Sequence, residues 1–316
     1  MKVTAAKVHE LFAEAQHIVL TPHVHPDGDC LGAMLGLYFY LCQQGKKVDM
    51  LLDDIVPPYL FFLPGHENIF QPVSPVQADL LVVLDASDEE RLGKVKETVK
   101  APVLNIDHHV SNTAFADYLF LDTAASATSE IIYGLLRETK AVVSADMAVC
   151  LYTGIATDSG FFRYTNTSPQ TMRFAAELME AGAQPHKIAE TLELRSVESL
   201  TTMADILKTL EFFADNQIAF LTASPEVLAK GSDHTEGLIN YPRSIEGVEV
   251  SALFKVVDEQ TVRISMRSKH VDVSKIALAL GGGGHVRAAG CTFIGTISAA
   301  KEMIYKLAVR ELENKE

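Results

Sequence analysis

The sequence contains few cysteines, no long apolar run and no excess of basic residues. Its four cysteines form no C-x-x-C pair, and so few in a chain of 316 residues argue against a disulfide framework. We therefore expect reduced thiols in or near the core. No apolar run reaches the roughly 18–20 residues that a membrane helix requires, and residues 1–14 lack the apolar stretch and cleavage site of a secretion signal. The sequence thus predicts a cytoplasmic protein with no membrane partner.

The charge balance restricts the nucleic acids that the protein could bind. The chain has 27 basic and 41 acidic residues, for a formal net charge of −14. Binding of long DNA or RNA needs many lysines and arginines on phosphates, so this class is disfavoured. A short RNA or a small nucleotide remains compatible with the charge, and a bound cation would offset part of the acidity.

The pattern of the first half predicts an α/β fold. The chain is 48% hydrophobic and 22% charged, as expected of a globular protein, and its length favours two domains. Short apolar runs alternate with helical patterns, which predicts a mostly parallel sheet with helices on both faces. We expect strands at 17–21, 47–52, 79–84 and 102–106, and helices at 29–44, after Ser126 and after Ser144.

A different pattern begins after residue 214. Residues 172–210 are helical in pattern and nearly free of strands. Beyond them we expect strands at 217–222, 248–257 and 261–266, and helices at 272–280 and 298–312. The sequence therefore predicts a first domain at 1–185, a helical linker at 186–214 and a smaller C-terminal α/β domain at 215–316.

Clusters of carboxylates and imidazoles follow three of the predicted strands. The first occupies residues 23–29, the second is Asp85, and the third is the run 107–109. Ligands of an open parallel sheet bind outside the carboxyl ends of its strands, so we expect the three clusters to share one edge. A fourth carboxylate, Asp158, follows the apolar helical run 147–156.

Several of these residues also have an ordinary structural explanation. Asp29 would serve as the N-cap of the following helix, Asp85 as a turn residue and Asp158 as the end of a helix. Two adjacent histidines after an acidic residue favour a metal or catalytic role instead.

Together the clusters favour a metal centre. Mixed oxygen and nitrogen donors suit Mn²⁺, with Mg²⁺, Co²⁺ or Fe²⁺ as less suitable occupants. Only Cys30 offers a thiol nearby, which disfavours a structural zinc site. Six or seven donors exceed the needs of one ion and fit two ions bridged by a carboxylate.

The order of these residues resembles a known family. The spacing His23-x-x-x-Asp27-x-Asp29, followed by Asp85, Asp107-His108-His109 and Asp158, resembles the DHH phosphoesterase superfamily. The run from Gly281 to Gly290 is similar to the signature of the DHH-associated C-terminal domain, and the pairing most resembles the NrnA-like group of nanoRNases that are also pAp phosphatases.

The resemblance implies roles for the individual residues. One Mn²⁺ would be held by His23, Asp27 and Asp85, and a second by Asp29, Asp85, His108 and Asp158. His109 would polarise the phosphate or transfer a proton, with Asp107 in support. His25 has no role in the family pattern, and Cys30 stands where small residues such as alanine and serine are common.

The second domain carries the expected substrate contacts. A flexible linker is the alternative for the glycine run, but its place between two helical segments, with His285 attached, favours a loop that approaches a ligand with its backbone. We expect substrate binding by Gly282, Gly283, Gly284 and His285. By resemblance, Arg267 with Ser268 would grip a terminal phosphate; Arg163 is a weaker candidate, and Tyr241 and Arg243 are weaker still.

The activity implied by the resemblance is hydrolysis of phosphoester bonds. The leading hypothesis is an oligoribonuclease that also converts pAp to AMP and phosphate. A phosphodiesterase acting on cyclic di-AMP or pApA is the nearest alternative. An inorganic pyrophosphatase, or a nucleotide-binding regulator with an inactive metal centre, ranks lower. The resemblance also allows a homodimer formed through the first domain.

Overall fold

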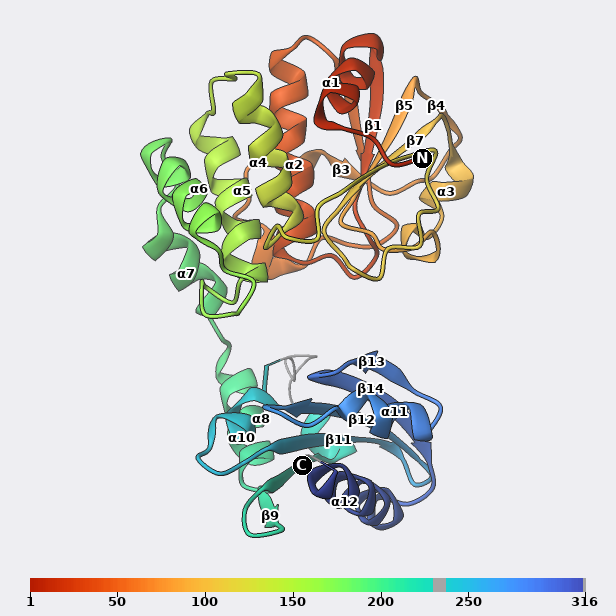
Figure 1. Ribbon diagram of the computed structural model, residues 1–316, viewed down its shortest axis with the longest axis vertical. Coiled ribbons are helices and arrows are strands. Elements are labelled where there is room, and N and C mark those ends of the chain that lie inside the picture. Colours follow the sequence, from red (N-terminus) through yellow and green to blue (C-terminus); the bar gives the residue numbers. More distant parts are fainter. Residues whose placement is uncertain (230–236, 315–316) are drawn as a thin grey trace. The chain divides into compact units, whose positions relative to one another are not determined.

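The computed structural model describes residues 1–229 and 237–314 (Figure 1). The chain forms two compact units, Met1–Leu194 and Arg195–Glu316. The segment 186–214 is divided between them, because α7 (Pro185–Glu193) belongs to the first unit and α8 (Val197–Leu207) to the second. Within the described residues, no helix combines the length and the apolar character needed to cross a membrane.

The first unit is built on a six-stranded parallel sheet. Its strand order is β3-β2-β1-β5-β7-β8, and every neighbouring pair is parallel. The four strands predicted from the sequence are present, and β3 and β8 extend the sheet at its two edges. The strands are β1 (His17–Thr21), β2 (Lys47–Leu51), β3 (Ile69–Phe70), β5 (Leu80–Leu84), β7 (Val103–Asp107) and β8 (Tyr118–Leu121).

Both faces of this sheet are covered. In β1, Ile18 and Leu20 point into the larger core, whereas Val19 points into a smaller core on the opposite face. The larger core contains the apolar faces of α1, α2, α4 and α5, and the smaller one contains the short helix α3. This arrangement confirms the predicted α/β fold with helices on both faces. The helices are α1 (Ala5–Glu14), α2 (Gly28–Gln43), α3 (Val95–Thr98), α4 (Thr128–Glu138), α5 (Ala145–Asp158) and α6 (Pro169–Glu180).

Short elements complete the first unit. Three single-turn 3₁₀ helices lie in the connections, and two short strands form a separate parallel pair. These elements are η1 (Pro58–Leu60), η2 (His66–Asn68), η3 (Glu90–Leu92), β4 (Val76–Gln77) and β6 (Val99–Lys100).

Helices α2 and α5 pack closely because glycines line their contact (Figure 1). A Cβ atom on Gly32 would lie 2.5 Å from the carbonyl oxygen of Cys150, and one on Gly28 would lie 2.5 Å from Thr157 Oγ1. Helix α2 starts at Asp27, whose Oδ1 accepts the N–H groups of residues 29 and 30. The N-cap is therefore Asp27, and the expectation that Asp29 fills this position was wrong.

The second unit contains a six-stranded mixed sheet in the order β13-β14-β12-β11-β10-β9. Only β10 and β11 are parallel, and the other pairs are antiparallel. Helices α11 and α12 pack on one face, and α8 with α10 on the other. The elements are β9 (Glu211–Phe213), β10 (Ile218–Ala223), α9 (Pro225–Leu228), α10 (Asn240–Ser244), β11 (Val250–Asp258), β12 (Thr261–Ser268), α11 (Val273–Ala279), β13 (Gly283–His285), β14 (Ala288–Ile294) and α12 (Ile297–Glu313). A second, smaller α/β domain is thus confirmed.

The glycine run differs from the expected loop. Residues 283–285 form the edge strand β13, which pairs with β14, a strand that the sequence pattern did not predict. A Cβ atom on Gly282 would lie 2.2 Å from the carbonyl oxygen of Gly290, and one on Gly284 would lie 2.5 Å from that of Ala288. These two glycines are therefore required by the hairpin itself. Only Gly283 combines an ordinary φ with open space around its Cα.

Candidate metal centre

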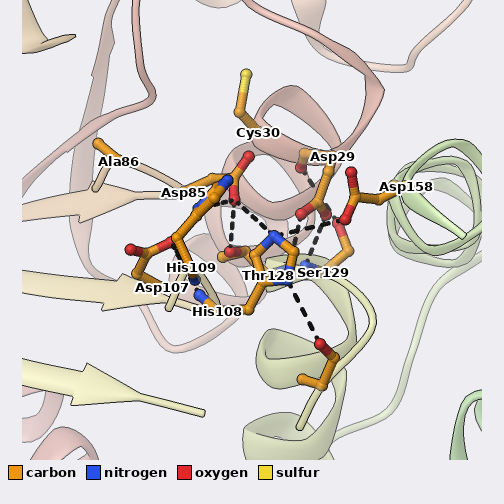
Figure 2. Close-up of polar contacts among 12 residues, drawn as sticks. Asp29, Cys30, Asp85, Ala86, Asp107, His108, His109, Thr128, Ser129 and Asp158 are labelled. Carbon is orange, nitrogen blue, oxygen red and sulfur yellow. Dashed lines mark hydrogen bonds and ion pairs between the residues drawn. The ribbon is translucent and has the colours of Figure 1, made fainter. Parts of the chain in front are cut away.

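The predicted clusters meet at the carboxyl ends of the central strands. His23 follows β1, Asp85 follows β5, and Asp107 ends β7. Strands β1 and β5 are neighbours in the sheet. After β1 the chain continues to β2 and β3 at one edge, and after β5 it continues to β7 and β8 at the other edge, so the strand order reverses between β1 and β5. This reversal is the position at which open α/β sheets bind ligands. Helices α2, α4 and α5 add residues to the same site (Figure 2).

Asp85 lies at the middle of the centre. Its Oδ2 is 3.5 Å from His23 Nε2, and its Oδ1 is 3.5 Å from His108 Nε2. The hydroxyl of Thr128 donates a hydrogen bond of 2.9 Å to Oδ1. The side chain is 3% exposed, and its backbone has a φ of +61°, which is uncommon outside glycine and costs about 1–3 kcal/mol. One carboxylate oxygen thus faces each half of the site, as a bridging ligand requires.

The first half contains His23, Asp27 and Cys30, whose donor atoms all lie within 4.8 Å of one another. His23 Nδ1 is 2.8 Å from the carbonyl oxygen of Val24. Since a carbonyl only accepts, Nδ1 is the protonated nitrogen and Nε2 is directed at the site. Burial lowers the pKa of His23, but hydrogen bonds to Asp27 and Asp85 outweigh it, and the pKa is raised.

The second half contains Asp29, His108 and Asp158, again within 4.8 Å of one another. His108 Nε2 is 3.4 Å from Asp158 Oδ2, and Nδ1 of the same ring is held by the carbonyl oxygen of Ala125 at 3.4 Å. Figure 2 shows His108 between Asp85 and Asp158.

The carboxylate of Asp29 caps a helix other than its own. The backbone N–H groups of Thr128 and Ser129, at the start of α4, donate to its two oxygens at 2.6 and 2.8 Å. Helix α4 has no side-chain cap from its own N-cap residue, Ala127. The first turn of α4 therefore fixes the orientation of Asp29 as well as holding Asp85 through Thr128.

Several buried carboxylates lie close together at this site, and their mutual repulsion would favour binding of a cation. Burial, and then the charges of Asp85 and Asp27, raise the pKa of Asp29 well above its usual range. Burial, and then the charge of Asp29, raise the pKa of Asp158 to about 7. Divalent ions would remove this repulsion, and the mixed set of carboxylate and imidazole donors suits Mn²⁺ or a similar ion.

Asp107 supports the two histidines. Its Oδ1 accepts the backbone N–H groups of His108 and His109 at 2.8 and 3.2 Å, and also the His109 Nδ1–H at 2.7 Å. Its Oδ2 accepts an N–H of Asn112 at 2.6 Å. Burial lowers the pKa of His109, but the bond to Asp107 and the charge of Asp85 outweigh it and raise the pKa to about 9.

Several residues that shape the site were missed from the sequence. Thr128 and Ser129 look like an ordinary helix start, and Asn112 lies in a loop with no recognisable pattern. Asn112 also donates to Asn105 Oδ1 at 2.7 Å, and Asn105 in turn donates to the carbonyl oxygen of Val83 at 3.3 Å. The order of Ser-x-Thr-Ser before a helix was the available signal for α4.

The predicted substrate residues lie on other elements of the chain than these groups. Arg163 donates from Nε to the carbonyl oxygen of Gly160 at 2.8 Å. In the second unit, Arg267 and His285 both pair in register with Ala288, so they occupy one face at the same end of the sheet. Ser268 is buried, and its hydroxyl donates to the carbonyl oxygen of Val271.

Comparisons with known proteins identify the family of the chain. The chain matches the DHH family, N-terminal domain, over residues 17–155 and the DHHA1 domain over residues 228–312. It is 36% identical over 298 residues to the bifunctional oligoribonuclease and PAP phosphatase NrnA of Thermus thermophilus, covering 93% of this chain and 89% of that protein. The chain therefore belongs to the DHH family of phosphoesterases.

Solved structures share the fold. An exopolyphosphatase-related protein from Bacteroides fragilis is 27% identical, with a TM-score of 0.90 over 99% of this chain and 97% of that one. RecJ from Thermus thermophilus, crystallised in complex with Mn²⁺, is 15% identical, with a TM-score of 0.52 over 97% of this chain and 54% of that one.

Proposed function

We propose that the protein is a two-metal, Mn²⁺-dependent phosphoesterase that hydrolyses short oligoribonucleotides to mononucleotides and converts pAp to AMP and phosphate. The observation that carries this proposal is the position of Asp85, with one carboxylate oxygen toward each of two donor groups. The substrate class is supported by the relative from Thermus thermophilus, which is named for both activities.

The donor sets divide naturally between two ions. One would be held by His23, Asp27 and Asp85, and the other by Asp29, Asp85, His108 and Asp158. Bound divalent ions would supply an activated water and charge stabilisation for the phosphoryl group. Mn²⁺ is the proposed ion, and RecJ, a neighbour of the same fold, is described as a complex with Mn²⁺.

The protein's own residues would position these reactants. Asp107 holds His109 through Nδ1, which leaves Nε2 of His109 for the phosphate oxygens or the leaving oxygen. The hydrogen bond from His109 to Asp107 favours a protonated ring, which would suit stabilisation of a developing negative charge. Thr128 and the start of α4 fix Asp85 and Asp29, so their geometry is set before substrate binds.

Substrate recognition is assigned to the second domain. Arg267, with its forked guanidinium, suits a terminal phosphate, and His285 and Gly283 share the same end of the sheet. Ser268, Gly282 and Gly284 would act by shaping this region, since the hydroxyl of Ser268 is already engaged and the two glycines are packed. Arg163 remains a proposed phosphate contact. The net charge of −14 fits local recognition of a few nucleotides better than a long track.

The proposal also includes a catalytic domain at 1–185, a linker at 186–214 and a substrate domain at 215–316. It places the protein in the cytoplasm and includes a homodimer formed through the first domain. Size-exclusion chromatography with light scattering would measure the oligomeric state directly.

A substrate panel tests the proposed activity. Purified protein with Mn²⁺ is incubated separately with pAp, pApA, short RNA and cyclic di-AMP. The variants Asp85→Ala and Asp146→Ala are assayed in the same way. Asp146→Ala is the control, because Asp146 is an exposed carboxylate at the end of α5 opposite to Asp158. We expect turnover of short RNA and pAp by the wild type and the control, and nearly none by Asp85→Ala. Turnover of the cyclic dinucleotide alone would overturn the substrate assignment, and full activity of Asp85→Ala would overturn the two-metal centre.

A further inference from the structure

Cys30 lies in the first half of the metal centre. It is the third residue of α2 and is fully buried, and its Sγ lies within 4.8 Å of donor atoms of His23 and Asp27. Two ligands of one zinc-like ion, with bonds of about 2.1 Å to nitrogen and about 2.3 Å to sulfur, lie at most about 4.4 Å apart. A small movement would therefore place all three donors on one ion.

The ring of His23 points independently to an ion on this side. His23 is 3% exposed, and its nearest carboxylate oxygens lie 3.5 and 3.7 Å from Nε2, beyond the length of a normal hydrogen bond. Among the residues that the structure describes, the polar side chains next to the His23 ring are those of Asp27, Asp85 and Cys30, all of them candidate ligands of the same centre. A buried nitrogen held in this way is oriented for a ligand that both it and Asp27 can reach.

The thiol also has a structural role, which a hydroxyl could fill equally well. The backbone N–H of Asp27 lies 3.3 Å from Sγ, and this contact closes the capping box of α2. Serine is the usual residue for such short-range capping contacts. What serine cannot supply is a soft, polarisable sulfur donor.

We propose that Cys30 is a ligand of the first metal position and that it raises the affinity of this position for thiophilic ions such as Cd²⁺, Zn²⁺ and Co²⁺ above that of the same site without sulfur. On binding, the thiol loses its proton to solvent and the sulfur forms the bond to the metal. This inference rests on the proposed two-metal centre, because it takes that centre's first ion as its ligand.

Cobalt spectroscopy tests the sulfur bond directly. Metal-free protein is titrated with Co²⁺, and binding is followed both by calorimetry and by the thiolate-to-cobalt charge-transfer band in the near ultraviolet. The variants are Cys30→Ser, which preserves the capping contact, and Cys42→Ser, an exposed cysteine about 18 Å further along α2. Wild type and Cys42→Ser should show the band, and Cys30→Ser should bind two Co²⁺ without it.

Competition between ions gives a second readout. Cys30→Ser should weaken Cd²⁺ binding by about tenfold or more, while Mn²⁺ binding should change much less. Two bound Co²⁺ without a band in the wild type, or a band that persists in Cys30→Ser, would overturn the role of Cys30 and leave the proposed function standing. A wild type that binds no Co²⁺ at all would overturn both.

Discussion

Two glycines in neighbouring helices offer a sharp test of how the metal centre is built. Gly154 lies in α5, where an added Cβ would be 2.0 Å from Ser129 Oγ and 2.8 Å from Asp29 Oδ1. Gly134 lies in α4, where the nearest atom to an added Cβ is a Phe174 ring carbon at 3.7 Å, an ordinary contact. Replacing each glycine with alanine therefore adds the same methyl group in two very different surroundings.

The expected energies have opposite signs. Alanine in place of a helical glycine stabilises a protein by about 0.5–1 kcal/mol where there is room, so Gly134→Ala should gain about that much. At Gly154, Ser129 Oγ could rotate away, but Ser129 Cβ, at 2.7 Å, and the Asp29 carboxylate would still be too close. Overpacking of this kind costs about 1–3 kcal/mol. We expect Gly154→Ala to lose about 2 kcal/mol and to weaken metal binding by displacing Asp29.

The assay combines urea denaturation of the metal-free variants with calorimetric titration of Mn²⁺. Gly134→Ala serves as the control for the helical effect of alanine and should bind Mn²⁺ as the wild type does. If both variants were stabilised, or if Gly154→Ala bound two Mn²⁺ with wild-type affinity, the assignment of Asp29 to a tightly packed metal centre would be refuted.

Three further predictions follow from individual contacts. Thr128→Val removes the hydrogen bond to Asp85 and should lower kcat/KM by about tenfold, because hydrogen bonds to charged groups contribute about 1.5–3 kcal/mol. Thr128→Ser keeps the hydroxyl and should retain most of the activity. Equal rates for the two variants would contradict this role of Thr128. The folded pKa of Asp158 is about 7 against an ordinary value of 3.8, so its protonated form is favoured by folding and stability is lost as the pH rises from about 4 to about 7. In the presence of chelator, the melting temperature of Asp158→Asn minus that of the wild type should therefore increase as the pH rises from about 4 to about 7. A difference that stays constant over this interval would contradict the raised pKa of Asp158. Gly283→Ala should raise KM for pAp while leaving the melting temperature unchanged, because its Cβ would meet no atom of the chain; an unchanged KM would remove Gly283 from the substrate contacts.

The sequence predicted the centre of the fold better than its edges. The apolar strands β1 and β5 are buried on both faces, and their unbroken hydrophobic runs made them recognisable. Strands β3 and β9 have two or three residues, too few to establish a periodicity. Strand β14 begins with Ala288, Ala289 and Gly290, whose small side chains carry no β-strand signal, and this is why the glycine run was interpreted as a loop.

The candidate site was predictable where residues cluster along the chain. Asp107, His108 and His109 stand out as neighbours in sequence, and their position after a strand indicated the sheet edge at which they lie. Their different roles depend on contacts that sequence does not contain. Asn112 occupies the second oxygen of Asp107, and only the geometry shows that this carboxylate supports the histidines from behind.

Contacts made by helix α4 were beyond prediction for a related reason. Asp29 accepts N–H groups from residues about a hundred positions further along the chain, at the start of a helix that has no side-chain cap of its own. The sequence of α2 offers Asp29 as a local N-cap candidate, and the neighbouring Asp27 takes that place. The close approach of α2 and α5 through small residues brings Asp29 near Asp158.

The most direct test of the two-metal centre is to count the Mn²⁺ ions bound per chain in the wild type and in a variant of Asp85. Asparagine has nearly the same size as aspartate and tolerates the left-handed backbone of this position, so Asp85→Asn should fold normally. Equilibrium dialysis with elemental analysis should find two Mn²⁺ per chain in the wild type and in the control Asp146→Asn. Asp85→Asn should bind fewer than two at the same free Mn²⁺ concentration, because both positions lose a ligand. Two ions bound to Asp85→Asn with wild-type affinity would contradict the bridging role of Asp85.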